Sequence, residues 1–130
     1  MNTLRRLLAN GPLTGYPTRR GDEELLLRMA ASRFEFGRSY REAEVNEVLR
    51  NWLETFCAPY GIDHVTMRRR LVDTRFLVRD TAGAEYHLAA AKARELARDP
   101  SVNEDLAHVL EEIRHEREAR KRQYVPSDVQ

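Results

Sequence analysis

The sequence predicts a mainly α-helical protein with one small β-hairpin. Apolar residues recur at helical spacing in three segments before residue 75, which indicates three packed helices. The third of these segments carries three consecutive arginines, Arg68 to Arg70, and runs into two β-prone stretches separated by a turn. Three helices followed by a hairpin is the order of a winged helix. We therefore predict a winged-helix-like three-helix core with a C-terminal helical extension.

Residues 1–16 are predicted to form an N-terminal arm ahead of a domain over residues 17–88. A leucine-rich segment at residues 3–9 predicts a short frayed helix, and the glycines and prolines that follow break regular structure. Arg19 and Arg20 fall in the extended stretch after them and could reach a phosphate or a groove of DNA. The alternative is a pair of solvated arginines in a loop.

The first two core helices are predicted from their caps and apolar stripes. Asp22 is a suitable N-cap for a helix over residues 22–34, whose core face repeats at helical spacing. Ser39 with Glu42 reads as a capping box that opens the second helix. The core positions are Leu25, Leu26, Met29, Ala30 and Phe34 in the first, and Val45, Val48, Leu49, Trp52, Leu53 and Phe56 in the second.

The third helix is predicted over residues 62–74. At about 100° per residue, Met67 and Leu71 share the face that must point into the core. Thr66, Arg69 and Arg70 lie within an opposite polar arc, where they are candidates for contact with an external partner.

Arg68 differs from the two arginines that follow it, because its neighbours on the helix are apolar. We expect its stem to lie on apolar surface and its head to pair with an acid such as Glu44. Asp63 and Asp73, on the exposed arc, would weaken attraction to DNA.

The hairpin is predicted from residues 76–78 and 86–88, with Thr81-Ala82-Gly83 as the turn between them. Alternation along the strands places Leu77, Tyr86 and Leu88 inward. Arg79, near the tip, could touch a backbone phosphate. Acidic neighbours make a plain solvated hairpin the alternative.

Residues 89–130 are predicted to form a helical extension with a disordered end at 126–130. An alanine-rich helix over residues 89–98 stops at Asp99-Pro100, and Ser101 with Glu104 is a second capping box. One apolar stripe follows on the last helix: Val102, Leu106, Val109, Leu110 and Ile113. The stripe can pack on its own domain, which we favour, or its members Val102, Leu106, Val109 and Ile113 can pair with a second copy in a homodimer.

Composition favours a cytoplasmic protein without an active site. There are 22 basic and 21 acidic residues, so the chain lacks the basic excess typical of polyanion binders. No apolar run approaches the roughly 20 residues of a membrane span, and we find no signal-peptide pattern. The one cysteine, Cys57, is expected to be a buried inert thiol. The four histidines lack metal-ligand spacing, so we expect a non-enzymatic protein with no metal and no cofactor.

Several strings of this sequence resemble a small bacterial domain family of unknown function. They include Glu44-Val45-Asn46, the helix Met67-Arg68-Arg69-Arg70-Leu71-Val72-Asp73 and the hairpin Arg79-Asp80 to Gly83-Ala84-Glu85-Tyr86. The family has a Glu-Val-Asn signature, a Leu-Arg-Arg-x-Leu-Val-Asp helix and an Arg-Asp-x-x-Gly-x-x-Tyr hairpin. It occurs alone or fused behind helix-turn-helix regulators of the ArsR type. The resemblance covers about residues 17–88 and implies a winged-helix-like fold, a bacterial source and a role near transcription. This sequence departs from the pattern in a longer segment at residues 51–61.

Two functions of different class follow from these observations. In the first, the helix over residues 62–74 docks on duplex DNA through Thr66, Arg69 and Arg70, helped by Arg79, Arg19 and Arg20. In the second, the winged helix is a protein-interaction module, acting as an adaptor or accessory subunit of a larger complex through its hairpin or its C-terminal helix.

Overall fold

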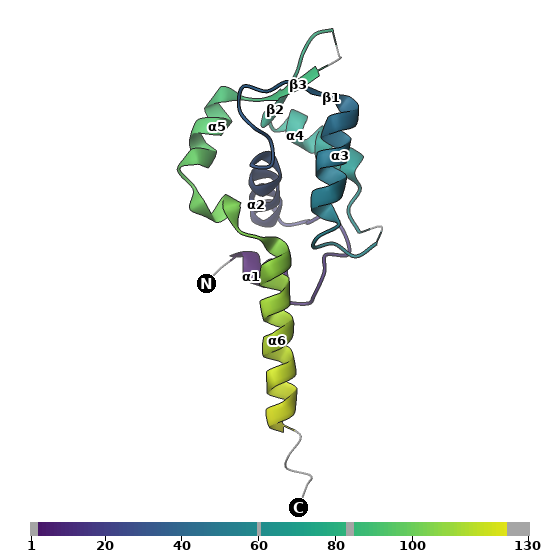
Figure 1. Cartoon of the computed structure of the whole chain (residues 1–130), viewed down its shortest axis with the longest axis vertical. Helices are drawn as coiled ribbons and strands as arrows, with labels where there is room; N and C mark the ends of the chain where they lie inside the picture. Colours follow the sequence, from purple (N-terminus) through teal and green to yellow (C-terminus); the bar gives the residue numbers. More distant parts are fainter. Residues whose placement is uncertain (1–2, 60, 83–84, 125–130) are drawn as a thin grey trace, which may run out of the picture.

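The protein is mainly helical, with a small antiparallel sheet. The computed structural model describes residues 3–59, 61–82 and 85–124. Figure 1 shows the elements, which follow in chain order: α1 (Thr3–Leu7), α2 (Arg20–Ala31), β1 (Tyr40–Arg41), α3 (Glu42–Leu53), α4 (His64–Asp73), β2 (Leu77–Arg79), β3 (Glu85–Leu88), α5 (Ala90–Ala97), the 3-10 helix η1 (Pro100–Asn103) and α6 (Leu106–Tyr124). The run α2–β1–α3–α4–β2–β3 confirms the predicted mainly α-helical fold with a small β-hairpin.

The sheet has the order β1-β3-β2, with both pairings antiparallel. Its short edge strand β1, which pairs Tyr40 with Tyr86, was not predicted. The predicted Ser39 cap is wrong for the same reason: pairing with β3 holds residues 40–41 extended. The helix instead begins at Glu42, and the Glu44 carboxylate accepts the backbone N–H of Arg41 at 2.9 Å.

The core lies between α2, α3, α4 and the sheet, and the inward faces of the hairpin are as predicted. Leu77, Tyr86 and Leu88 are buried. Asp22 does not cap α2, which begins two residues earlier; it is itself buried and accepts a hydrogen bond from the Arg6 guanidinium at 2.6 Å. The largest fully buried side chains are Phe56, Leu8, Leu26, Met29, Leu49, Met67, Leu71, Leu77, Leu106 and Val45.

The N-terminal arm is anchored on the domain. Leu8 is fully buried, and the backbone of Leu13 exchanges hydrogen bonds with the segment after α3, donating to Phe56 at 3.1 Å and accepting from Ala58 at 2.8 Å. Gly61 allows this approach, because a Cβ there would lie 2.6 Å from the Leu13 carbonyl oxygen. The arm therefore packs on the domain through both side-chain and backbone contacts.

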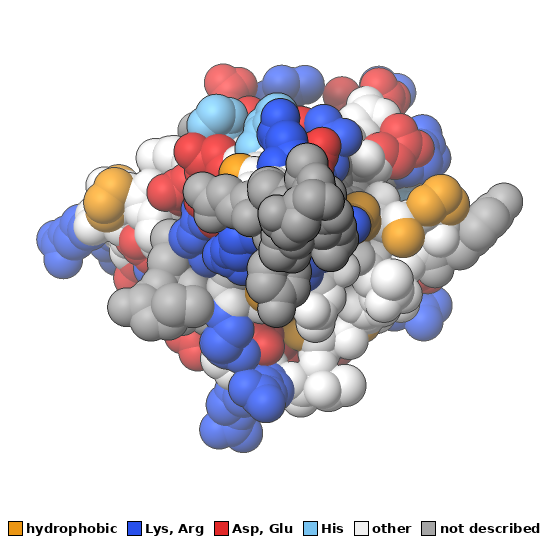
Figure 2. Space-filling model, turned by 90° about the horizontal axis from the view of Figure 1, so that it is seen from below, with side chains coloured by type: hydrophobic (Ala, Val, Ile, Leu, Met, Phe, Trp, Pro, Cys, Tyr) orange, Lys and Arg blue, Asp and Glu red, His pale blue; other side chains and the backbone are white. Residues whose placement is uncertain are grey.

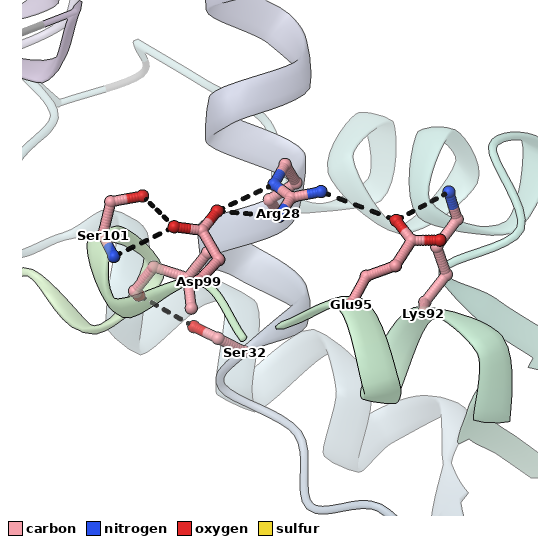
Figure 3. A network of polar contacts seen from close by, with 7 residues as sticks. Arg28, Ser32, Lys92, Glu95, Asp99 and Ser101 are labelled. Atoms are coloured by element: carbon pink, nitrogen blue, oxygen red, sulfur yellow. Dashed lines mark hydrogen bonds and ion pairs between the residues drawn. The ribbon is translucent and has the colours of Figure 1, made fainter. Parts of the chain in front are cut away.

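The C-terminal extension is fastened to α2 by a polar network. Figure 3 shows Arg28 donating to the Asp99 carboxylate, with Nη2 at 2.7 Å, while Ser32 donates to the Val102 carbonyl at 3.1 Å. The Asp99 carboxylate also accepts from the backbone and hydroxyl of Ser101, and these bonds together with Arg28 lower the pKa of Asp99. α5 and η1 are thus part of the same packed body.

The last helix packs its apolar stripe on its own chain. Val102, Leu106, Val109 and Ile113 are buried, which is the first of the two predicted alternatives. The capping box predicted at Ser101 is wrong, because residues 100–103 form a 3-10 turn. The Asp105 carboxylate accepts the N–H groups of Ala107 and His108 instead, at 3.0 and 3.3 Å.

The C-terminal part of α6, beyond its contacts with the N-terminal segment at Glu116 and Arg117, projects away from the body at the end of the long axis opposite the hairpin (Figure 1). Gly83 of the predicted turn and the tail predicted to be disordered lie outside the described residues. In the part of the chain described, no helix is both long and apolar enough to cross a membrane.

Candidate nucleic-acid interface

The helix α4 carries the candidate interface. Met67 and Leu71 are buried and fix one face of α4 against the core. The opposite face therefore points outward. At the C-terminal end, Arg75 adopts a left-handed backbone with φ 67°. The Phe76 N–H then bonds the Leu71 carbonyl at 2.9 Å and the Arg75 N–H bonds the Val72 carbonyl at 3.0 Å. This is a Schellman termination, and it turns the chain sharply into β2.

Arg68 is held inside the fold, as its position on the helix predicted. Its side chain is only 13% exposed. The predicted partner, Glu44, was wrong. The Arg68 guanidinium donates to the Asn46 side-chain oxygen and lies 3.9 Å from Glu42, and both residues are on α3. The Glu44 carboxylate instead accepts the Arg41 backbone N–H at the start of that helix. Arg68 therefore joins α4 to α3 and is unavailable to a partner.

Arg70 also has an internal partner, which the sequence did not predict. Its Nε donates to Glu23 Oε2 at 2.7 Å and its Nη2 to Oε1 at 3.3 Å. The Tyr16 hydroxyl donates to the same carboxylate at 2.6 Å. These hydrogen bonds, first from Arg70 and then from Tyr16, lower the pKa of Glu23. Burial and the bond to Glu23 raise the pKa of Tyr16. Arg70 is thus fastened to α2 and the arm.

Arg69 lies at the centre of the outer face of α4 and is exposed. Among the described residues it has no ion-pair partner. Thr66 is exposed beside it, and its hydroxyl lies 3.4 Å from an Asp63 carboxylate oxygen. Of the three consecutive arginines, only Arg69 is presented outward without an internal partner in the described chain.

Arg79 lies at the end of β2 and is exposed, with its guanidinium 6.0 Å from the centre of the Tyr86 ring. The hairpin follows α4 directly, so Arg79 comes from the element next to Arg69 in the fold. Val78, before it, is 39% exposed on the same strand.

Arg19 and Arg20 are exposed, but they do not lie in an extended arm as predicted. Arg19 is the N-cap of α2 and Arg20 its first residue. The charge of Arg20 contributes to the lowered pKa of Glu23, so Arg20 and Arg70 flank the same carboxylate. Arg19 and Arg20 therefore belong to the start of α2, at its border with α4, and not to a separate arm.

One family model matches this part of the chain. It describes an uncharacterized protein family conserved in bacteria (DUF2087) and covers residues 12–88. The chain belongs to this bacterial family. Searches of curated proteins and of solved structures give no match.

The DUF2087 segment contains the whole candidate interface. Arg19, Arg20, Thr66, Arg69, Arg70 and Arg79 all fall within it, whereas α5, η1 and α6 follow it. The match begins five residues before the predicted domain boundary. It therefore includes Leu13, whose backbone pairs with the segment after α3.

Two further features of the segment were not found from the sequence. Phe36, after α2, is 63% exposed. A cavity of about 720 Å³ at the junction of α3 and α4 is bordered by Cys57, Arg50 and His64. Burial raises the pKa of the Cys57 thiol to about 12, so the thiol stays protonated and unreactive at neutral pH. Within the described residues, no three His, Cys, Asp or Glu side chains cluster to hold a metal.

Proposed function

We propose that this DUF2087 protein binds duplex DNA through the outer face of α4, with the β2–β3 hairpin beside it, and acts near transcription. The observation that carries this proposal is the exposed Arg69 at the centre of a helix whose opposite face is locked into the core. Arginine matches the O6 and N7 acceptors of guanine in the major groove, a contact worth about 1–3 kcal/mol of discrimination. Thr66, one turn before Arg69, is placed to contact a phosphate.

The internal ties of Arg68 and Arg70 support this proposal by fixing where Arg69 points. Arg68 joins α4 to α3, and Arg70 joins it to α2. A helix held on both flanks presents its outer side chains in one orientation, which lowers the ordering cost of binding. Arg79 on the hairpin and Arg20 at the start of α2 are then cations at the borders of the face.

The near-neutral charge limits the strength of such binding. A formal net charge of +1 leaves little attraction from the whole protein. Asp63 and Asp73 on the exposed side of α4 also oppose a polyanion. We therefore expect few phosphate contacts and moderate affinity.

The test is fluorescence anisotropy with labelled mixed-sequence duplex DNA at about 50 and about 200 mM salt, where each phosphate contact gives a slope of about −0.9 in log affinity against log salt. The protein is compared with Arg69→Gln and with Arg33→Gln, a matched change at another exposed arginine. We expect salt-dependent binding that Arg69→Gln weakens roughly tenfold or more and Arg33→Gln leaves unchanged. Equal behaviour of the two variants would remove α4 as the interface.

A protein partner is the second candidate, and exposed apolar side chains favour it. Phe36 is 63% and Val78 39% exposed, and large exposed apolar residues commonly anchor protein interfaces. Absence of DNA binding at the lower salt concentration would favour this alternative. A partner captured by the protein but lost with Phe36→Ser or Val78→Ser would then establish it.

A further inference from the structure

The projecting end of α6 carries a cluster of positive charge that lies outside the α4 interface. Residues 114–122 include five arginine or lysine side chains and two glutamates, an excess of three positive charges in a protein whose total is +1. The remainder of the chain therefore has a formal charge of −2. Figure 2 views the molecule from this end, where Lys and Arg side chains are interspersed with Asp and Glu.

Three of the four acidic side chains of α6, Glu111, Glu112 and Glu116, are engaged nearer the body, whereas Glu118 lies within the basic segment. Glu116 accepts from Arg5 of α1 at 2.7 Å, and Glu112 lies 3.5 Å from the same guanidinium. Glu111 pairs with Arg114 on the helix itself. These pairs anchor the first half of α6 to α1 and to itself, which leaves the basic residues near the end as the exposed charge.

Three consecutive cations at that end are unpaired in the described part of the chain. Arg120, Lys121 and Arg122 are exposed, and their side chains make no ion pair or hydrogen bond with the residues whose side chains the structure describes, which end at residue 122. Arg117, by contrast, donates to the Ala9 carbonyl and belongs to the α1 contact. Cations at the C-terminal end of a helix also interact favourably with the negative end of the helix dipole.

The side chains of residues 114–122 indicate which class of partner binds this surface. Residues 114–122 are polar all round, so the segment has no apolar face to enter a lipid boundary. It also lacks the aromatic or aliphatic anchor that a protein interface needs at its centre. A phosphodiester backbone needs neither, because its binding comes from charge neutralisation and release of counterions.

We infer that Arg120, Lys121 and Arg122 form a second contact with duplex DNA, to backbone phosphates and independent of base sequence. The inference rests on the proposed function for the identity of the ligand, but it uses a different surface, at the opposite end of the long axis from the hairpin (Figure 1). α4 then supplies base contacts, while the end of α6 holds the backbone of a neighbouring stretch of DNA.

The test compares the protein with the triple variant Arg120→Gln/Lys121→Gln/Arg122→Gln, which keeps helix-forming side chains. The matched control, Arg33→Gln/Arg94→Gln/Arg98→Gln, removes the same charge from exposed positions elsewhere. Binding of mixed-sequence duplex DNA is measured over a salt series, with circular dichroism as the check on helix content. We expect the slope of log affinity against log salt to fall by about 2–3 in the α6 variant and to stay unchanged in the control.

Equal slopes in all three proteins, or equal losses in both variants, would overturn the inference, because the effect would then be absent or due to total charge alone. Loss of helix content without a change of slope would show that the three cations serve only the helix end, which also overturns it. Arg69→Gln separates the two proposals. If it has no effect while the α6 variant loses its slope, the α4 proposal fails and the α6 contact stands.

Discussion

At the scale of single residues, the three arginines of α4 have three different surroundings. Arg68 lies inside the contact with α3, Arg70 is fastened to Glu23 of α2, and Arg69 faces outward. Helical spacing alone separated Arg68 from the other two, because its neighbours on the wheel are apolar. It could not reveal the tie of Arg70, since Glu23 is 47 residues away in the chain.

We therefore expect Arg68→Ala to lower the stability of the fold and Arg69→Ala to weaken DNA binding. Removing Arg68 leaves Asn46 without its donor and should lower the free energy of unfolding by about 1–3 kcal/mol. Removing the exposed Arg69 should change it by less than about 0.5 kcal/mol while weakening DNA binding. Urea unfolding and anisotropy on the two variants measure both effects. Equal stability losses would contradict the assignment of Arg68 to the fold and Arg69 to the surface.

Glu23→Gln should strengthen DNA binding, because it releases the Arg70 guanidinium at the border of the interface. The slope of log affinity against log salt concentration should steepen by up to about 0.9, the value of one phosphate contact. Glu24→Gln removes the same charge from the adjacent exposed position and serves as the control. An identical gain in both variants would show a general charge effect instead of a released arginine.

The same carboxylate gives a pH dependence whose sign follows from its lowered pKa. Glu23 is easier to ionise in the folded protein, so its contribution to stability is complete above the unfolded pKa, about 4.3, and disappears as the pH falls through the folded value. The difference in unfolding free energy between the protein and Glu23→Gln should be constant above about pH 6 and shrink below it. A difference that grows on acidification would contradict the Arg70–Glu23 contact.

At the scale of elements, periodicity predicted the helices well and their ends poorly. Most buried positions of α2, α3 and α4 and the inward side chains of the hairpin were found from spacing, because burial sets the pattern directly. Leu27 and Ala31 are buried but were missed, and the predicted core residues Leu25 and Val48 are only partly buried. The caps at Asp22, Ser39 and Ser101 were misplaced. In each case a tertiary contact determined the local structure in place of the predicted cap. Asp22 binds Arg6, and the pairing of β1 with β3 holds the residues after Ser39 extended. The Arg28–Asp99 network fixes the segment that contains Ser101.

The turn between α4 and β2 could not have been predicted, because Thr74-Arg75-Phe76 has no glycine where the backbone turns left-handed. An arginine at φ 67° carries a steric cost of about 1–2 kcal/mol. Arg75→Gly should therefore raise the free energy of unfolding by about 0.5–1 kcal/mol, after the larger chain entropy of glycine is subtracted. Thermal and urea unfolding measure the gain. A loss of stability would show that the Arg75 side chain itself contributes to the fold.

At the scale of the whole molecule, the extension after residue 88 is built into the domain. The stripe on α6 joins the hydrophobic core, α6 pairs with α1, and the network around Arg28 holds the segment after α5 on α2 (Figures 1 and 3). A charged helix end projects from this packed body. The sequence could show that the apolar stripe on α6 must be buried against another surface. It could not show that α6 packs beside α1 and that η1 packs on α2, because these contacts span most of the chain.

Leu106→Ala tests this packing. The side chain is 2% exposed, and its truncation should lower the free energy of unfolding by about 2–5 kcal/mol. Because the cover comes from the same chain, the loss should be the same at all protein concentrations. A loss that vanishes on dilution would contradict packing within one chain and indicate a seam between two copies.

The most direct measurement on the interface is a titration of the ¹⁵N-labelled protein with duplex DNA, followed by NMR. Docking on α4 should shift the amide signals of Val65, Thr66 and Arg69 and of the strands β2 and β3, and the shifts on α4 should be lost in Arg69→Gln. Shifts confined to Phe36 and Val78 or to the end of α6, with α4 unchanged at saturation, would contradict α4 as the DNA-reading helix.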